Sequence, residues 1–344
     1  MRYLITGHTG FKGAWLSLML HREGHEVVGI ALDPLPGSLY ERASIAELVM
    51  EDHRIDLRDQ GLFAAAVQDS APDVVVHMAA QPLVRYSYRH PRETFETNVM
   101  GTFNVLEALS RLACVKAALI VTTDKVYRNV NRREGYRESE ALGAADPYST
   151  SKAMADLLTQ SWVASFPGAP TAVARAGNVI GGGDVSEDRL MPDILDGFEA
   201  GRSVPIRNPG AVRPWQHVLD CLTGYRAIID ALLDGRGSGE WNIGPGDEGF
   251  VSVGEMVDTA VRIWGDHAAW ERDSGDHPHE AGLLALDPTK AKSELGWDNR
   301  LPFPASLEWT IDWQRRVASG ESPRQVSLDQ IDLFAARLKG DPAR

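Results

Sequence analysis

Tyr148 and Lys152 are four residues apart, a spacing that places both side chains on one face of a helix, one turn from each other. There the lysine ammonium can lower the pKa of the tyrosine phenol, so that the phenol can take a proton from a sugar hydroxyl. Thr123, Asp124 and Lys125 precede this pair and supply a hydroxyl, a carboxyl and an amine. These residue types predict oxidation of a hydroxyl group combined with further proton transfer.

Three glycines near the start of the chain, Gly7, Gly10 and Gly13, follow an apolar segment at residues 2–6 and precede an apolar pattern with helical spacing. In such a strand–loop–helix context the first glycine permits a tight turn and the second a close approach of the backbone to a pyrophosphate. The third lets helix and strand pack, and the helix N-terminus faces the phosphates. Combined with the tyrosine–lysine pair, the loop predicts hydride transfer with a nicotinamide cofactor.

Strands and helices are expected to alternate along the first half of the chain. The strand patterns are apolar on both faces and lie at residues 2–6, 25–31, 73–77, 117–122 and 171–176, with helical patterns at 60–70 and 91–112 between them. Strands buried on both faces and joined through helices form parallel sheets. The sequence therefore predicts an α/β fold with a Rossmann-like, doubly wound parallel sheet.

The pattern changes after Arg175: three glycines at 181–183 interrupt regular structure, and prolines and tryptophans become frequent. Residues 218–233 again have helical spacing, and residues 241–244 resemble a strand that could return to the sheet. The expected domains are a cofactor-binding Rossmann domain at 1–177 with a returning segment at about 216–245, and a smaller, interleaved C-terminal α/β substrate domain at 178–215 and 246–344.

The 344 residues carry a net charge of −13, which argues against nucleic acid as a partner, although a few arginines can still bind the phosphates of a small molecule. The chain begins with a strand instead of a signal peptide and has no apolar run of about 18 residues, so we expect a cytoplasmic protein without membrane contact. Cys114 and Cys221 are too few and too distant for a zinc site, and the histidines lack ligand spacing. We expect buried, reduced thiols and no metal.

The glycine spacing GxxGxxG resembles that of the extended short-chain dehydrogenase/reductase superfamily, and the resemblance extends along most of the chain. It implies a Rossmann fold and further cofactor contacts, which lie at Phe11, Asp56, Leu57, Ala79, Ala80, Asn98 and Thr122. Ala79 and Ala80 are equally suited to tight packing. The resemblance also implies a homodimer, because the helices expected at residues 93–112 and 148–166 pair across a two-fold axis in this superfamily and form a four-helix bundle.

The choice between NAD and NADP depends on the end of the second expected strand. The acid that binds the ribose hydroxyls in this superfamily is replaced by Ala31, and Asp33 is either its substitute or a solvated turn residue before Pro34. No arginine stands next to this strand end in the sequence to bind a 2′-phosphate. We therefore expect NAD.

The Thr123–Asp124–Lys125 segment resembles that of the sugar-nucleotide 4,6-dehydratases. In this family Tyr148 would be the base for oxidation at C4 of the hexose, Lys152 would hold the nicotinamide ribose, and Thr123 would orient the hydroxyl. The new ketone acidifies the C5 proton, a base removes it while an acid protonates the leaving C6 hydroxyl, and the stored hydride returns to C6. The resemblance assigns Lys125 as the base and Asp124 as the acid; an ion pair between the two is the alternative.

Most such dehydratases have Asp-Glu where this chain has Asp-Lys. An Asp-Lys pair at these positions resembles that of the members that act on CDP-glucose. The same resemblance lies in GHTGFKGAW at 7–15, AAQPLVRYSY at 79–88, TNVMGT at 97–102, DPYSTSK at 146–152, RAGNVIGGGD at 175–184, RLMPD at 189–193 and RPWQHVL at 213–219. Val126 departs from it, since a cysteine is expected there. The implied product is CDP-4-keto-6-deoxyglucose. The alternatives are another NDP-sugar dehydratase (for a GDP-linked hexose or heptose), an NDP-sugar epimerase, and a non-catalytic cofactor-sensing protein.

The resemblance also implies which residues bind the sugar nucleotide. Arginine suits the diphosphate because its planar fork binds phosphate oxygens at two points. The implied contacts are Asn178, Arg189, Arg207 and Arg213 for the nucleotide and diphosphate, Arg85 and Ser87 for the pyranose, and His279 over the ribose. For each arginine the alternative is a surface ion pair, and for His279 a structural role.

Overall fold

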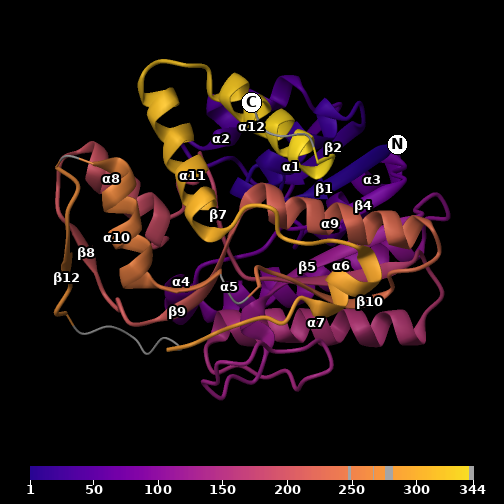
Figure 1. Ribbon diagram of the computed structural model, residues 1–344. Coiled ribbons are helices and arrows are strands. Elements are labelled where there is room, and N and C mark those ends of the chain that lie inside the picture. The colour runs from indigo at the N-terminus through magenta and orange to yellow at the C-terminus, as the bar shows by residue number, and fades with distance from the viewer. Residues whose placement is uncertain (247–248, 266, 276–281, 341–344) are drawn as a thin grey trace.

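The structure is a computed structural model that describes residues 1–246, 249–265, 267–275 and 282–340. Among these residues a parallel sheet of seven strands forms the centre of the molecule, in the order β10-β6-β5-β4-β1-β2-β3 (Figure 1). The strands are β1 (Arg2–Thr6), β2 (Glu26–Ala31), β3 (Glu51–Arg54), β4 (Val74–His77), β5 (Ala117–Thr123), β6 (Thr171–Ala176) and β10 (Gly239–Ile243). The strand order reverses between β1 and β4, and ligands bind at such a switch point in doubly wound sheets.

Helices cover both faces of the sheet, because successive strand residues point to opposite sides. Tyr3 and Ile5 of β1 belong to a hydrophobic core shared with α1 (Phe11–Arg22) and α9 (Val218–Leu233). Leu4 between them belongs to a second core, which α3 (Gln60–Ser70), α6 (Gly101–Ser110) and α7 (Pro147–Ser165) cover. The doubly wound α/β fold expected from the sequence is confirmed.

The C-terminal half interleaves with this sheet. β10 pairs in parallel with β6, with Trp241 opposite Ala174, so the strand expected at residues 241–244 does return. α12 (Pro323–Leu338) packs against α1 and contributes Ile331 and Phe334 to the first core. The expected domains assign residues 246–344 to the substrate domain. α12 belongs to that range, but its apolar side chains pack on the cofactor-binding half.

A smaller unit surrounds a third hydrophobic core. Its strands are β7 (Asn178–Ile180), β9 (Val212–His217) and β11 (Phe250–Ser252) in one sheet and β8 (Val204–Ile206) and β12 (Trp270–Arg272) in another. Its helices are α8 (Leu190–Glu199), α10 (Val253–Trp264) and α11 (Phe303–Ala318). Leu307 and Ile311 of α11 belong to this core, whereas Trp313 and Val317 belong to the first core. One helix thus holds the two units together.

The helix expected at residues 91–112 is divided in three. α5 (Pro91–Phe95) leads into a π-helical turn at Glu96–Met100, which continues as α6. Such turns often occur at functional sites, and hydrophobic periodicity does not distinguish them from the α-helix around them. The short helices elsewhere are α2 (Leu39–Arg42), α4 (Val84–Arg89), a second π turn at Ala291–Leu295, and 3-10 turns at Ile45–Glu47 and Asp124–Val126.

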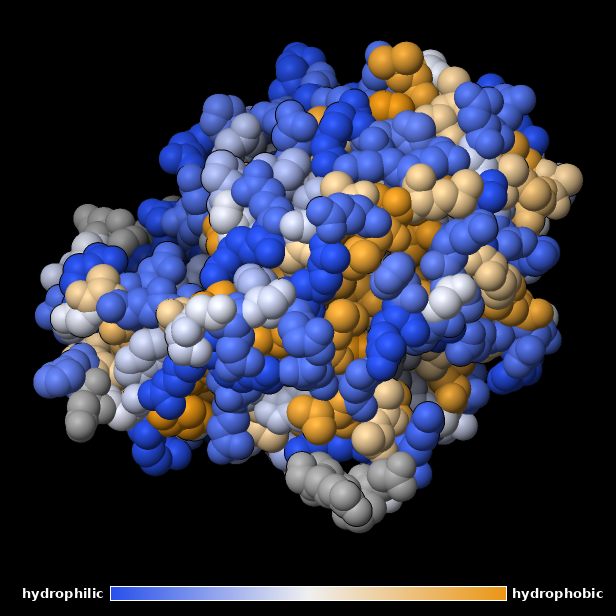
Figure 2. Space-filling model, turned by 90° about the horizontal axis from the view of Figure 1, so that it is seen from above, coloured by the Kyte–Doolittle hydropathy of each residue, from blue (hydrophilic) through white to orange (hydrophobic). Residues whose placement is uncertain are grey.

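Hydrophilic side chains dominate the face seen in Figure 2, with apolar side chains gathered near its middle. In the described part of the chain, no helix is long and apolar enough to cross a membrane. Nor do these residues contain a cluster of three or more His, Cys, Asp or Glu side chains that could hold a metal ion. Cys221 is buried as expected, but Cys114 is exposed in the connection between α6 and β5, which corrects the expectation of two buried thiols.

Candidate active site

A cavity of about 1510 Å³ opens at the carboxyl ends of the central strands. Gly7 after β1, Ala79 after β4, Thr123 at the end of β5 and Asn178 after β6 all line it. Its far wall comes from the smaller unit and includes Arg213 of β9. The cavity therefore lies between the two units, with the sheet edge on one side.

The glycine loop forms a cradle at the N-terminus of α1. Gly7 has a φ of +77°, and a Cβ there would lie 2.8 Å from the backbone of Ala79. A Cβ on Gly13 would lie 2.2 Å from the Gly7 carbonyl oxygen. α1 has no side-chain cap at Gly10 and no acidic residue in its first turn, so its first amides are open to an anion. This loop fits the diphosphate of a dinucleotide.

The other residues expected to bind the cofactor divide into two groups. Phe11, Asp56, Leu57, Ala79, Ala80 and Thr122 line the cavity. Asn98 does not: its amide donates to the Ser151 hydroxyl at 2.8 Å and the Gln81 carbonyl at 3.1 Å, and its oxygen accepts from the Gln81 amide at 2.8 Å. Asn98 therefore holds the segment after β4 against α7, and both of these elements line the cavity.

The end of β2 differs from expectation. Ala31 lines the cavity, but Asp33 lies outside its wall with 89% of its side chain exposed. An arginine does lie beside this strand end, because the parallel register places Arg54 of β3 opposite Ala31. Its guanidinium contacts Asp33 at 3.5 Å and Asp52 at 2.7 Å, so two carboxylates already compensate its charge.

The end of β5 brings three functional groups together. Thr123 donates its hydroxyl hydrogen to Asp124 Oδ1 at 2.8 Å, and Lys125 Nζ lies 3.6 Å from the same oxygen. Thr123 and Lys125 line the cavity, whereas the Asp124 side chain is fully buried behind them. Asp124 Oδ2 has no hydrogen-bond partner among the described residues, which leaves one acceptor free in this cluster.

Tyr148 and Lys152 lie in the first turns of α7 and line the cavity beside Thr123. Asp146 caps the helix by accepting from the Ser149 amide at 2.9 Å. Ser87, expected to contact the sugar, is fully buried and off the cavity wall: its hydroxyl oxygen accepts from the Tyr148 amide at 3.1 Å. Ser87 thus fixes the start of the helix from outside the cavity wall, and its contact with the sugar stays a prediction.

An arginine that the sequence analysis did not connect with the tyrosine adds to the charges around it. Burial raises the pKa of the Tyr148 phenol, and Arg189 and a polar contact with Thr123 act against this rise. The Lys152 ammonium donates to the Val121 carbonyl at 2.7 Å. Burial, with the charge of Lys12, lowers the pKa of Lys152 to about 7. The charge of Arg189 therefore acts on the Tyr148 phenol in the direction expected of the lysine.

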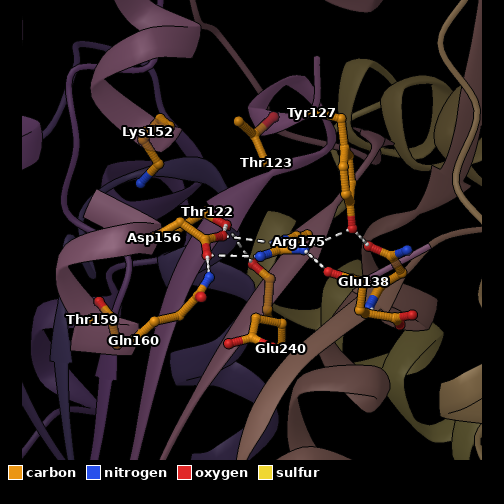
Figure 3. Close-up of polar contacts among 12 residues, drawn as sticks. Thr122, Thr123, Tyr127, Glu138, Lys152, Asp156, Thr159, Gln160, Arg175 and Glu240 are labelled. Atoms are coloured by element: carbon orange, nitrogen blue, oxygen red, sulfur yellow. Dashed lines mark hydrogen bonds and ion pairs between the residues drawn. The ribbon is translucent and has the colours of Figure 1, made fainter. Parts of the chain in front are cut away.

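A buried polar network supports this end of the sheet (Figure 3). Arg175 of β6 forms two hydrogen bonds with Asp156, one turn beyond Lys152 on α7, each at 2.8 Å. It also donates to the Tyr127 hydroxyl at 2.9 Å, and that hydroxyl donates to Asn242 of β10 at 2.7 Å. The network connects α7, the segment after Lys125 and the returning strand β10.

The residues expected to bind the sugar nucleotide lie mostly on the far wall. Asn178, Arg85, Arg189, Arg207 and Arg213 line the cavity. Asn178 Oδ1 is buried and has no hydrogen-bond partner among the described residues. His279 lies outside the described residues.

Two further cavity residues escaped the sequence-based prediction. Asp188 contacts Arg85 at 2.8 Å and Arg207 at 4.0 Å, and it has a positive φ of 56°, which is uncommon for a residue other than glycine. In the sequence, Asp188 lies between the motifs RAGNVIGGGD and RLMPD, and this position could have indicated a residue of the site. Lys12 is the other, a charged residue inside the glycine loop.

Comparisons with known proteins agree with this geometry. Residues 3–244 match the model of the NAD dependent epimerase/dehydratase family. The chain is 45% identical to CDP-glucose 4,6-dehydratase of Salmonella typhimurium over 95% of each chain. It is 31% identical to dTDP-glucose 4,6-dehydratase of Mycolicibacterium smegmatis, over 96% of this chain and 98% of the relative.

The solved structure of dTDP-glucose 4,6-dehydratase from Bacillus anthracis in complex with NAD has the same fold, with a TM-score of 0.78 at 24% identity. The match covers 95% of this chain and 99% of that one. Likeness over nearly the whole length places this protein in the NAD-dependent epimerase/dehydratase family, with nucleotide-sugar 4,6-dehydratases among its relatives.

Proposed function

We propose that this protein is a CDP-glucose 4,6-dehydratase, a hydro-lyase that converts CDP-glucose into CDP-4-keto-6-deoxyglucose and recycles its NAD within each turnover. One observation carries the proposal. The cavity places Thr123, Lys125, Tyr148 and Lys152 together beside a dinucleotide cradle, with Asp124 directly behind them. The chain that does so is 45% identical to a CDP-glucose 4,6-dehydratase.

The first step is oxidation at C4 of the glucose. Tyr148 takes the proton of the C4 hydroxyl, and Thr123 orients that hydroxyl. Arg189 favours the phenolate form of Tyr148 by its charge, and Lys152 holds the ribose side of the cofactor. When bound, NAD accepts the C4 hydride and later returns it to C6.

The second step is elimination of water. The C4 ketone acidifies the C5 proton, and Lys125 removes it. The C5–H electrons form the C5=C6 bond as the C6–O bond breaks, and Asp124 protonates the departing hydroxyl to give water. Lys125 Nζ and Asp124 Oδ1 lie 3.6 Å apart as the ion pair named above, and the proposal requires one proton to pass from the ammonium to the carboxylate, which gives the neutral amine and the carboxylic acid that this step uses. Hydride addition at C6 and a proton at C5 then complete the 6-deoxy-4-ketone.

Arginines that line the cavity wall bind the diphosphate in this proposal, and Arg85 of α4, expected from the sequence beside the pyranose, is assigned to them because it shares Asp188 with Arg207. Arg85 and Arg207 converge on Asp188, so a carboxylate now occupies the position between two guanidinium groups where phosphate oxygens would fit. Asn178 Oδ1, buried without a partner in the described structure, accepts a hydrogen bond from the substrate. Arg189 and Arg213 complete this wall.

The test is incubation with a panel of NDP-hexoses and NAD, followed by alkali, in which 4-ketosugars develop a near-ultraviolet absorbance. Rapid product formation from CDP-glucose is expected, with loss of the C6 hydroxyl seen by mass spectrometry. Turnover of a GDP- or dTDP-linked donor alone would overturn the choice of base. Interconversion of C4 epimers without water loss would make the protein an epimerase, and absence of all turnover with NAD bound would leave a sensing role.

We further propose that the protein is a homodimer through a four-helix bundle. Met154 and Leu157 of α7 and Met100 of the π turn are 43%, 52% and 51% exposed, which is unusual for side chains of this size. Phe103 of α6 contacts Trp162 of α7 with ring centroids 5.5 Å apart, so the two helices form one continuous surface. The occupant that fits it is the same surface of a second copy.

A cytoplasmic location is also part of this proposal. Cys114 and Cys221 are both free, and Cys114 is exposed, where an oxidising compartment would modify it. Fractionation of cells that express the full chain tests it, with the soluble cytoplasmic fraction as the expected location and an exported, processed form as the contrary result.

A further inference from the structure

Asp188 is an acidic residue of the cavity wall that meets two of the arginines assigned to the diphosphate. It lies in the connection between β7 and α8, and its Oδ1 accepts a hydrogen bond from Arg85 Nη1 at 2.8 Å. Arg207 Nη1 approaches the same oxygen at 4.0 Å. Arg85 belongs to α4 and Arg207 follows β8, so one carboxylate brings together guanidinium groups from both units of the molecule.

This contact differs from the ion pairs that hold the fold together. Arg175 and Asp156 share two hydrogen bonds, with 1% and 0% of their side chains exposed. Asp188 receives one hydrogen bond, and 28% of its side chain is exposed. Arg85 and Arg207 are 38% and 27% exposed. Ion pairs that water reaches in this way contribute little to stability, so the contact can open at a small cost.

The backbone at Asp188 points to a role other than stability. Its φ of +56° lies in the left-handed region, which side chains other than glycine seldom adopt. Glycine would adopt this conformation without cost. The chain instead places a carboxylate here in a sparsely populated conformation, although its ion pairs return little stability. Such positions are concentrated at functional sites.

A second carboxylate belongs to the same group of charges. Asp193 lies in the first turn of α8 and lines the cavity. Burial raises the pKa of Asp193, Arg207 acts against this rise, and Asp188 adds to it. Two carboxylates therefore share Arg207 and repel each other. A diphosphate offers more negative charge and more acceptor oxygens than one carboxylate, so it can replace Asp188 on both arginines.

We propose that Asp188 is a displaceable counter-ion of the diphosphate site, an inference that rests on the proposed function. In the free protein Asp188 holds Arg85 and Arg207. The diphosphate of the incoming sugar nucleotide takes both guanidinium groups and releases the carboxylate. Asp188 takes them back as the product leaves.

A counter-ion of this kind suits the proposed reaction. Substrate and product carry the same diphosphate, so arginines that bind the substrate tightly also retain the product. Competition from Asp188 lowers the affinity for both, because the apparent affinity falls with the fraction of the protein whose arginines are free. Contacts to the base do not involve these arginines in this proposal, so they are not weakened.

The test compares the wild type with Asp188→Asn and Asp188→Gly. Both variants remove the charge, and asparagine and glycine both tolerate a positive φ. Full-length protein saturated with NAD, which fills the glycine cradle, is titrated calorimetrically with CDP, cytidine and inorganic pyrophosphate. The matched control is Asp332→Asn, which removes a carboxylate that pairs with Arg22 on the surface between α12 and α1. Circular dichroism verifies the fold of each variant.

Both Asp188 variants are expected to bind CDP and pyrophosphate about three- to tenfold more tightly than the wild type, because two partly exposed ion pairs no longer have to open. Cytidine, which has no phosphate, should bind unchanged, and Asp332→Asn should match the wild type throughout. In a chase with excess unlabelled CDP, labelled CDP should leave the Asp188 variants more slowly.

Three results would overturn the proposal. Unchanged affinities would show that Asp188 does not compete with phosphate. Weaker binding of CDP and pyrophosphate would make Asp188 a residue that positions the arginines. Equal tightening of cytidine would place the effect away from the diphosphate. If the protein uses a different base, CDP binds poorly and the proposed function fails, whereas pyrophosphate carries no base and still decides the role of Asp188.

Discussion

Arg175 and Asp156 form a bidentate ion pair in the interior, with 1% and 0% of their side chains exposed. Asp156 follows Lys152 by one helical turn, and Arg175 stands on β6 beside the strand that ends in Thr123 (Figure 3). Thr122 also donates to Asp156 at 3.0 Å. The pair therefore fixes α7, which carries Tyr148 and Lys152, against the strands that end beside Thr123.

Replacement of this arginine tests the strength of the pair. Arg175→Met should lower the free energy of unfolding by about 3–5 kcal/mol, because it leaves the Asp156 carboxylate buried without a counter-ion. Urea denaturation followed by circular dichroism measures the change. Arg22→Met is the matched control: its pair with Asp332 is more than half exposed on both sides, and about 0–1 kcal/mol is expected there. Equal losses in the two variants would contradict the buried-pair account.

Lys125 can be separated from the oxidation step. Lys125→Met should still form the reduced cofactor from CDP-glucose but should lose at least ~99% of the C5 proton exchange, because a general base typically contributes about 10²–10⁴-fold. Mass spectrometry of sugar incubated in D₂O measures that exchange. Lys292→Met, which removes an exposed lysine that pairs with Asp298, should exchange normally. Normal deuterium uptake in Lys125→Met would remove this residue from the role of base.

Lys152 should weaken the fold of the nucleotide-free protein at neutral pH. Its folded pKa is about 7 and its unfolded pKa is near 10.5, so between these values the unfolded chain binds more protons and stability rises with pH. The wild type should therefore gain stability relative to Lys152→Met from pH 7 to 10, by up to about 1.4 kcal/mol per pH unit. Denaturant titrations at several pH values measure this difference. A difference that stays constant over the range would contradict the lowered pKa.

The exposed apolar surface of α7 and the π turn predicts that a charge placed on it separates the proposed dimer. Leu157→Glu places a carboxylate in the centre of the proposed four-helix bundle and should convert the protein to monomers at micromolar concentration, as seen by light scattering after gel filtration. Leu62→Glu is the control, since Leu62 on α3 is 59% exposed and lies outside this surface. A wild type that is itself monomeric would contradict the proposed homodimer.

Local signals in the sequence predicted much of this molecule. The strand–glycine–helix pattern defined the dinucleotide cradle, because the positive φ at Gly7 and the contact at Gly13 exclude side chains whatever the rest of the chain does. Tyr148 and Lys152 share a helix face through helical geometry alone. Alternation of apolar strands and helices predicted the doubly wound sheet, since burial on both faces leaves few other arrangements.

Tertiary structure decided which polar side chains reach the cavity and which support it from behind. Ser87 and Asn98 stand in motifs that indicate binding, yet both form hydrogen bonds to neighbouring backbone and side chains and do not line the cavity. Strand register placed Arg54 opposite Ala31, a relation between residues 23 positions apart in the chain. The charge of Arg189, from the start of another element, acts on the Tyr148 phenol. Electrostatic interactions depend on distance and burial in three dimensions, and sequence spacing determines neither beyond one turn or one strand.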